Sequence, residues 1–418
     1  MKKISRLPVA FLVLLLFAGA QDLRAWGKTW MGAALELAIR QAAWKFGPFR
    51  IQPALNLRDA GYDSNLYYGY AGEPVKDYSV TAGPEFTIYL PMKKKLVLSF
   101  YGSPQYVYYR KTRQERTWNY YLSGQANVVL NRFFITVGGG GSDARQRWNT
   151  EVDIRPRRKA WNAEASVLWQ ATRKTSFFAR FARQKYDFEN LDYERSNIRD
   201  RLNRTEDRLN FTGYYQVSYR VRSFMNVEYG RFDFLRSAGF KDSRSLGLFG
   251  GFEFSPLGIV RGRVNLGYKV FDSAVSGRRL FRGLVGDTAV SVRLLRFLNV
   301  RGSYRRDVEF SVWYNNTYFT ESIYGGGLSI YVHRKVRLDY DYRLGRNRYP
   351  ESAAGVPGNS CRRCAFSSSA PDANPSCAAR SNAARKVASF ASSRWRCQLA
   401  RPRASTRIVG GSGLAALK

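Results

Sequence analysis

Apolar and polar residues alternate one by one along most of the chain, and this period of two constrains the fold more than any other feature. Successive side chains of a β-strand point to opposite faces, so each alternating run predicts a strand with one apolar and one polar face. The clearest runs lie at 49–58, 78–90, 122–130, 161–170, 209–221, 260–270 and 336–344. The sequence therefore predicts an all-β domain over residues 49–350.

The connections between these runs alternate between short and long. Longer polar stretches, such as Ser142–Pro156 and Phe188–Asp207, separate the short connections. The short ones lie at Pro91–Lys95, Asn131–Arg132, Ala171–Lys174, Arg222–Ser223, Ser255–Gly258, Leu295–Phe297 and His333–Lys335. Short turns at one end and long loops at the other are typical of outer-membrane barrels, with the short turns in the periplasm. We therefore expect a transmembrane antiparallel β-barrel of about 16 strands, of which about 15 are visible in the sequence.

A soluble β-sandwich would also show alternation, but three features disfavour it. The runs reach about ten residues, the length of a tilted membrane crossing. Charged residues occur on the polar face and almost never on the apolar one. Aromatic residues gather near the strand ends, as at Trp118 beside a long loop and Trp169 beside a short turn. The apolar face is thus expected to contact outer-membrane lipid.

The first residues have the pattern of a secretory signal peptide. A basic start at Lys2 and Lys3 precedes the apolar run Leu7–Gly19, and small residues end the segment at residue 20, with a second possible cleavage site after Ala25. The run is shorter than the roughly 20 residues that a transmembrane helix needs. Export places the chain outside the cytoplasm, so a nucleic-acid partner is excluded despite the net charge of +36.

Residues 26–48 have a helical period in place of the strand period. Leu35, Ile39 and Phe46 fall near one face, and Gly47-Pro48 ends the pattern. A short amphipathic helix on the periplasmic side is expected here. Two interpretations of it remain open: a packed N-terminal extension, or a plug or gate at the mouth of the barrel.

The composition changes sharply after Glu351. All 27 Tyr lie before residue 350, and all 4 Cys lie after residue 360. The segment 351–418 is rich in Ala, Arg, Ser and Pro and shows no sustained alternation. We expect an aberrant, disordered tail in which a shifted reading frame has replaced the closing strand. Bacterial barrels have an even strand number, so one strand is otherwise missing.

No metal site or cofactor is expected. Cys361 and Cys364 have the spacing of half a zinc site, but Cys377 and Cys397 stand far apart and no His lies near them. Gly138–Gly141 lacks the Lys-Ser or Lys-Thr that follows a phosphate-binding loop. Close approach between strands is the expected role of these glycines.

An enzymatic function is also not expected. The single histidine, His333, falls in a short turn beside Arg334 and Lys335, on the periplasmic side, where neither an acyl hydrolase nor a rim protease of this membrane has its His. The acidic residues Asp187, Glu189, Asp192 and Glu194 fit no calcium loop and are expected to form a salt-bridged loop.

The polar face is expected to line a lumen wide enough for an aqueous channel. Acidic residues share this face, but cations are in excess. The candidate pore-lining residues are Arg261, Arg263, Lys269, Arg301, Arg305, Arg337 and Arg343. Cation-lined pores favour anions, so passive diffusion of small anionic solutes is the leading hypothesis. The alternative is a barrel with a blocked lumen that acts in envelope anchoring, assembly or export of an acidic polysaccharide.

The run FRIQPALNLRDAGYDSNLYYG at 49–69 resembles the opening strands of outer-membrane β-barrel porins, in which a strand is followed by an Asp-Ser-Asn segment, here at 63–65. The architectural similarity covers roughly residues 49–346. The resemblance implies a barrel and a pore, and it implies no catalytic residues. The missing closing strand departs from the pattern of the family.

Overall fold

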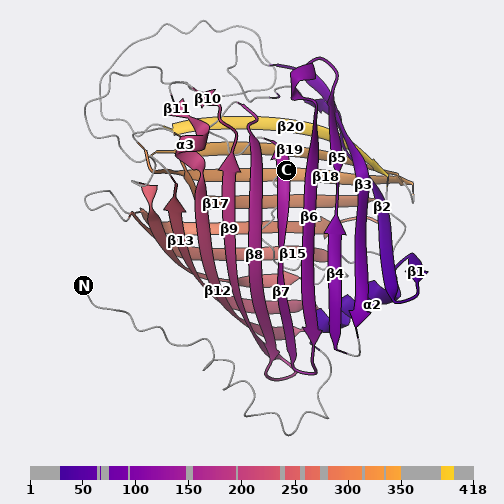
Figure 1. The fold of residues 1–418 in the computed structure, drawn as a ribbon. Coiled ribbons are helices and arrows are strands. Elements are labelled where there is room, and N and C mark those ends of the chain that lie inside the picture. Colours follow the sequence, from indigo (N-terminus) through magenta and orange to yellow (C-terminus); the bar gives the residue numbers. More distant parts are fainter. Residues whose placement is uncertain are drawn as a thin grey trace, which may run out of the picture.

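A single antiparallel sheet curls into a barrel in the computed structural model (Figure 1). The structure describes residues 29–63, 66, 75–92, 95–146, 154–193, 196–235, 241–254, 259–273, 281–312, 316–333, 336–349 and 387–399. The signal peptide expected at residues 1–20 lies outside these ranges, as does most of the segment 351–418.

The wall of the barrel follows the order of the chain, and each strand pairs with its neighbours in sequence. Its strands are β2 (Phe49–Asp63), β3 (Asp77–Met92), β4 (Leu96–Gly102), β5 (Gln105–Tyr109), β6 (Thr117–Val129), β7 (Phe133–Arg145), β8 (Arg157–Gln170), β9 (Thr175–Phe188), β12 (Arg204–Ser218), β13 (Val221–Phe234), β14 (Ser243–Phe254), β15 (Val260–Ser273), β16 (Phe281–Arg293), β17 (Leu298–Phe310), β18 (Tyr318–His333), β19 (Val336–Arg348) and β20 (Val387–Leu399). Because β4 and β5 share one position between β3 and β6, the described wall has sixteen strand positions, as expected.

Strand β20 corrects the expectation that the closing strand is lost. It pairs with β19 along its whole length and with β2 through Asp63 and Arg394, so it joins the last strand to the first. Arg394 and Arg396 alternate here with Trp395 and Cys397, which is the period of two that a wall strand needs. Residues 387–399 of the segment thus form a described strand, and the expectation of an aberrant tail from a shifted reading frame stays a prediction.

The predicted alternation of short turns and long loops is confirmed, with one shift. The turn between β12 and β13 lies at Tyr219–Arg220 and not at Arg222–Ser223. The long loops carry small elements of their own: β10 (Asp192–Tyr193), β11 (Ser196–Asn197), α3 (Ile198–Leu202) and the 3-10 helix η1 (Arg113–Glu115). We refer below to the short-turn end and the long-loop end of the barrel.

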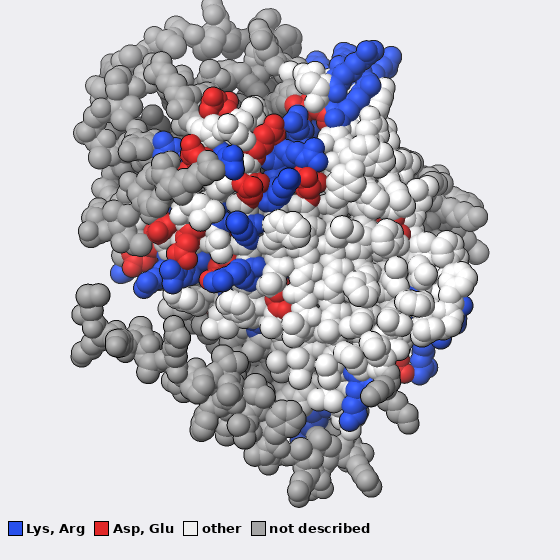
Figure 2. Space-filling view, viewed as in Figure 1, with Lys and Arg blue, Asp and Glu red and all other residues white. Residues whose placement is uncertain are grey.

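The outward face of the wall is apolar across the middle of the barrel. Large hydrophobic side chains lie exposed on strand after strand, among them Leu55, Leu122, Phe211, Leu248 and Leu284. Figure 2 shows this broad uncharged surface, with charged residues gathered above it at the long-loop end. An apolar band around a closed sheet without free edges is the architecture of a transmembrane β-barrel. No helix among the described residues is long and apolar enough to cross a membrane.

Aromatic rings border the apolar band at both ends. Near the short turns Phe133 stacks on Trp169, with ring centroids 6.3 Å apart, and Trp169 contacts Phe177. Near the long loops Trp118 lies between Tyr106 and Tyr120. The predicted clustering of aromatic residues at strand ends is confirmed, and these positions match the level of lipid headgroups.

The N-terminal helix is shorter than expected. Within the range 26–48, α2 covers Trp30–Arg40, and the hydroxyl of Thr29 caps it by accepting the N–H of Gly32. A short strand, β1 (Trp44–Phe46), then pairs with the start of β2. The two are joined by a tight turn in which Gly47 has a φ of 51°, a left-handed conformation that favours glycine.

Candidate functional site: the barrel lumen

The seven candidate pore-lining residues share one face of the wall. Lys269 points inward, since it is buried against Asp307 of β17, and the register gives Arg261 and Arg263 the same alternation. Strands β17 and β19 carry the others on the corresponding face: Arg301, Arg305, Arg337 and Arg343. The side chain of Arg337 lies outside the described residues. The polar face predicted from the sequence is thus the inner wall of the barrel.

Glu253 of β14 lies between two arginines of neighbouring strands. Arg222 of β13 donates from Nε to Glu253 at 3.0 Å, and Arg263 of β15 lies 3.5 Å from the other carboxylate oxygen. Arg263 also stacks over the ring of Phe224, at 4.1 Å from its centroid. Its side chain is 44% exposed, against 21% for Glu253. The group carries one net positive charge, and Arg263 presents it to the solvent.

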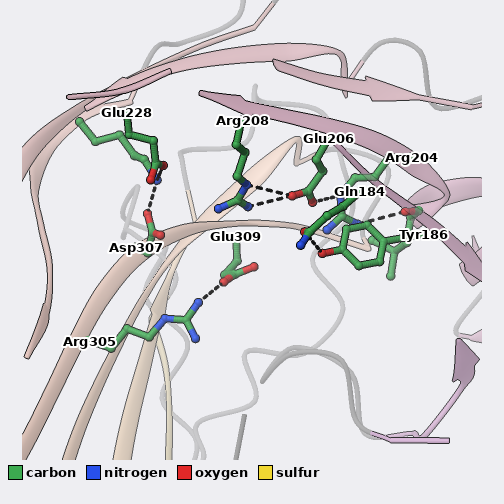
Figure 3. A network of polar contacts seen from close by, with 11 residues as sticks. Gln184, Tyr186, Arg204, Glu206, Arg208, Glu228, Arg305, Asp307 and Glu309 are labelled. Atoms are coloured by element: carbon green, nitrogen blue, oxygen red, sulfur yellow. Dashed lines mark hydrogen bonds and ion pairs between the residues drawn. The ribbon is translucent and has the colours of Figure 1, made fainter. Parts of the chain in front are cut away.

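A second arginine–glutamate–arginine group lies on β12, nearer the long-loop end (Figure 3). Glu206 accepts from Arg204 Nε at 2.7 Å and from Arg208 Nη2 at 2.8 Å. Arg204 and Glu206 are both 2% exposed, whereas Arg208 is 40% exposed. Again the carboxylate is buried and one arginine remains accessible. Sequence analysis did not single out these three residues.

A third group has more acidic than basic residues. Lys269 donates to Asp307 at 2.8 Å and lies 3.9 Å from Glu228 of β13. Beside it, Arg305 pairs with Glu309 at 2.7 Å, as Figure 3 shows. The lumen is therefore mixed in charge, as expected. In each of the two arginine groups cations outnumber acids and one arginine faces the solvent, while in the third group acids outnumber the lysine.

The long-loop end of the lumen is filled on the side of β12–β18. A buried cluster of rings packs there, drawn from Phe232, Phe234, Phe249, Phe271, Phe281, Phe310 and Tyr318. The guanidinium of Arg204 lies 5.0 Å from the ring of Phe310 on β17 and 4.8 Å from that of Tyr186 on β9. Strands β12 and β17 are not neighbours in the wall, so the contact with Phe310 crosses the lumen and narrows it, whereas Tyr186 lies directly opposite Arg204 on the adjacent strand β9.

The loop between β9 and β12 adds to this filling. Ile198 and Leu202 of α3 are buried against Val312, which follows β17. Lys241, from the loop after β13, donates to the carbonyl oxygen of Ser311. Three long loops therefore meet over the same part of the barrel, and α3 lies there at the opposite end from α2 (Figure 1).

The short-turn end of the lumen holds α2. Met31 and Leu35 pack against Val97, Phe134 and Leu168, which point inward from β4, β7 and β8. A Cβ at Gly32 would lie 2.9 Å from a methyl group of Val129, so a larger residue here would require that side chain to move. Trp30 contacts the other side of the barrel, under the guanidinium of Arg222 at 4.4 Å. The helix is packed and lies at the mouth of the barrel, so a packed extension and a plug or gate both remain open.

The glycine run and the acidic loop singled out in the sequence make structural contacts. A Cβ at Gly138 or Gly140 would lie within 2.6 Å of a backbone oxygen, which confirms close approach between strands. In the acidic loop Arg199 lies 3.8 Å from Asp187, an ion pair of the expected kind. His333 ends β18, and its side chain lies outside the described residues.

No group of three or more metal-ligating side chains occurs in the described ranges. Three of the cysteines, Cys361, Cys364 and Cys377, lie outside those ranges. Cys397 falls in β20, opposite Leu338 of β19. The zinc half-site therefore has no described structure.

No protein-family model matches the sequence. No curated protein matches it either. Among solved structures, the siderophore receptor PirA from Pseudomonas aeruginosa has a TM-score of 0.37 at 11% identity, over 73% of this chain and 57% of the receptor. The FrpB iron transporter from Neisseria meningitidis has a TM-score of 0.41 at 9% identity, over 74% of this chain and 55% of the transporter. OccAB3 from Acinetobacter baumannii has a TM-score of 0.40 at 9% identity, over 83% of this chain and 99% of OccAB3. The chain thus spans little more than half the length of the two iron-uptake proteins.

Proposed function

We propose that this chain is a channel of the bacterial outer membrane for the passive diffusion of small solutes, preferably anions. The observation that supports the proposal is the pair of arginine–glutamate–arginine groups in the lumen. In each, the carboxylate and one arginine are largely buried, and the other arginine, Arg208 or Arg263, is 40% or 44% exposed. The proposal includes no enzymatic activity and no cofactor.

Exposed cations in a narrow lumen raise the local concentration of anions. A unit charge about 6 Å from a passing ion is worth about 0.7 kcal/mol in water, which raises the local concentration of an anion about threefold and lowers that of a cation about threefold. Arg208 and Arg263 together would then raise the local anion concentration about tenfold and lower the local cation concentration about tenfold. The acidic group around Lys269 opposes them, because Asp307 is itself partly exposed. A moderate preference for anions is therefore proposed, not an absolute one.

The alternative is a barrel whose lumen is blocked and which anchors, assembles or exports an envelope polymer such as an acidic polysaccharide. The filled long-loop end favours it, since Arg204 contacts rings on both β9 and β17. Helix α2 narrows the other end. Conductance separates the two proposals, because a blocked barrel passes no steady current.

The test is the reversal potential of the full chain in a planar bilayer under a salt gradient. The unmodified protein is expected to conduct with an anion-selective potential. The double variant Arg208→Gln with Arg263→Gln is expected to lose at least about tenfold in the anion-to-cation permeability ratio.

The matched control is Arg183→Gln with Arg231→Gln. These two arginines belong to the same wall but point outward, where each pairs with an aspartate. The control removes the same charge and is expected to keep the selectivity. A folded but silent barrel would contradict the channel and favour the alternative, and equal losses in both variants would contradict the role of the lumen arginines.

A further inference from the structure

The loop between β5 and β6 concentrates positive charge at the edge of the apolar band. It reads Arg110-Lys111-Thr112-Arg113-Gln114-Glu115-Arg116, with four cations and one acid. Arg110, Lys111 and Arg113 are exposed, whereas Glu115 is buried. The blue group at the top of Figure 2 lies over this loop, which follows β5 in Figure 1. The exposed face of the loop is therefore cationic.

The backbone of the loop is held in a defined shape. The buried carboxylate of Asp77, at the start of β3, accepts the backbone N–H of Lys111 at 3.0 Å and that of Thr112 at 2.7 Å. From the other side Arg116 donates to the carbonyl oxygens of Tyr109 and Arg110. The cations thus project from a rigid support, which lowers the entropy lost when they bind an anion.

The loop lies directly beside the aromatic border of the membrane face. The guanidinium of Arg116 stacks over the ring of Tyr108, 4.3 Å from its centroid. Tyr108 and Trp118 both point outward and are exposed. Rings of this kind lie at the level of lipid headgroups. The basic loop consequently faces the headgroup layer and not the lumen.

We propose that the β5–β6 loop is a binding site for the phosphorylated headgroup of a glycolipid in the leaflet that surrounds the long-loop end. Phosphate oxygens accept charge-assisted hydrogen bonds from arginine and lysine. The acyl chains of such a lipid would lie on the apolar wall below, which a soluble polysaccharide could not use. The inference rests on the membrane location of the barrel but not on its channel function.

The test is the binding of lipid A to the full refolded chain in neutral detergent, followed by native mass spectrometry. Diphosphorylated lipid A is expected to bind in a salt-dependent way, and lipid A without phosphates at least about tenfold more weakly. The triple variant Arg110→Gln, Lys111→Gln and Arg113→Gln is expected to lose about tenfold or more in affinity. Asp77→Asn keeps the four cations but loosens the backbone, and a smaller loss is expected.

The matched control is Arg173→Gln, Lys174→Gln and Arg220→Gln. These three exposed cations lie in short turns at the opposite end, and Arg220 stacks on a tyrosine as Arg116 does. This control is expected to keep the affinity within about twofold. The proposal is overturned if both triple variants lose affinity equally, if phosphate-free lipid A binds as well, or if an acidic polysaccharide without acyl chains competes fully. Because conductance is measured separately, a silent barrel that still binds lipid A would contradict only the channel.

Discussion

The two ends of the lumen are narrowed by opposite kinds of chemistry. At the long-loop end, Arg204 and Glu206 are buried together among aromatic rings from several strands. At the short-turn end, Leu35 and its neighbours on α2 pack against apolar side chains. The contacts at the long-loop end are made by side chains of the wall strands themselves, whereas those at the short-turn end are made by a helix that precedes the wall. The difference indicates that the long-loop end is a fixed part of the barrel and that α2 is the part that can move.

The largest effect is expected from Glu206→Gln. The substitution leaves Arg204 buried without its counter-charge, and breaking a buried pair in this way costs about 3–5 kcal/mol. The free energy of unfolding of the refolded barrel in detergent, followed by tryptophan fluorescence, measures the loss.

The next residue on the same strand provides its control. Asp207 points outward and pairs with Arg183, which is 60% exposed. Asp207→Asn is expected to cost less than about 1 kcal/mol. An equal loss in the free energy of unfolding for the two substitutions would show that the buried pair stabilises the barrel no more than an ion pair on the exterior.

A second substitution, Leu35→Ala, addresses the short-turn end. Removing a buried leucine side chain weakens packing by about 2–5 kcal/mol. The loss concerns the docking of α2 and not the strand pairs of the wall. Faster tryptic cleavage after Arg40 and a higher conductance, at an unchanged unfolding midpoint, are therefore expected.

Leu37→Ala is the control on the same helix, because Leu37 is exposed. It is expected to change neither cleavage nor conductance. A lower unfolding midpoint for Leu35→Ala, without faster cleavage, would show that α2 is as fixed as the other end.

The smallest effect is expected from Trp30→Leu. The substitution keeps apolar bulk but removes the ring under Arg222, and such contacts are worth about 0.5–2 kcal/mol. Tryptic cleavage after Arg40 should rise, but less than in Leu35→Ala. Cleavage at the same rate as in the unmodified chain would show that the contact between Trp30 and Arg222 does not stabilise the docking of α2, and that its apolar face alone does.

The sequence pattern predicted the strands and the inner wall wherever one face meets lipid. Arg263, Lys269, Arg301 and Arg305 were placed on the polar face by alternation alone, and the structure agrees. The limit of the method is visible at 204–207, which sequence analysis assigned to a loop. Both faces of β12 are polar there, because the strand extends beyond the apolar band, so the period of two in hydrophobicity vanishes.

Other features depend on register, which alternation does not give. The grouping of Glu253 with Arg222 and Arg263 requires the pairing of three successive strands. Strand β20 was missed for a different reason. Ser389, Ala391 and Ser393 alternate along it, and these residues are too small or too polar to stand out from the surrounding tail.

A lumen exists only if the sheet closes, and closure depends on β20. Leu338 and Cys397 are directly opposite each other in β19 and β20. Opposed residues of antiparallel strands have Cα atoms about 4.5–5.5 Å apart, within the range that a disulfide spans. Leu338→Cys, in a chain with Cys361→Ser, Cys364→Ser and Cys377→Ser, tests the closure directly.

The measurement is the yield of the disulfide with Cys397 after refolding and mild oxidation, mapped by mass spectrometry. Efficient formation from Leu338→Cys is expected. Asp339→Cys, whose partner in the register is Arg396, is expected to give little, because adjacent positions point to opposite faces. Equal yields from the two variants, or none from Leu338→Cys in a folded barrel, would contradict a barrel closed by β20.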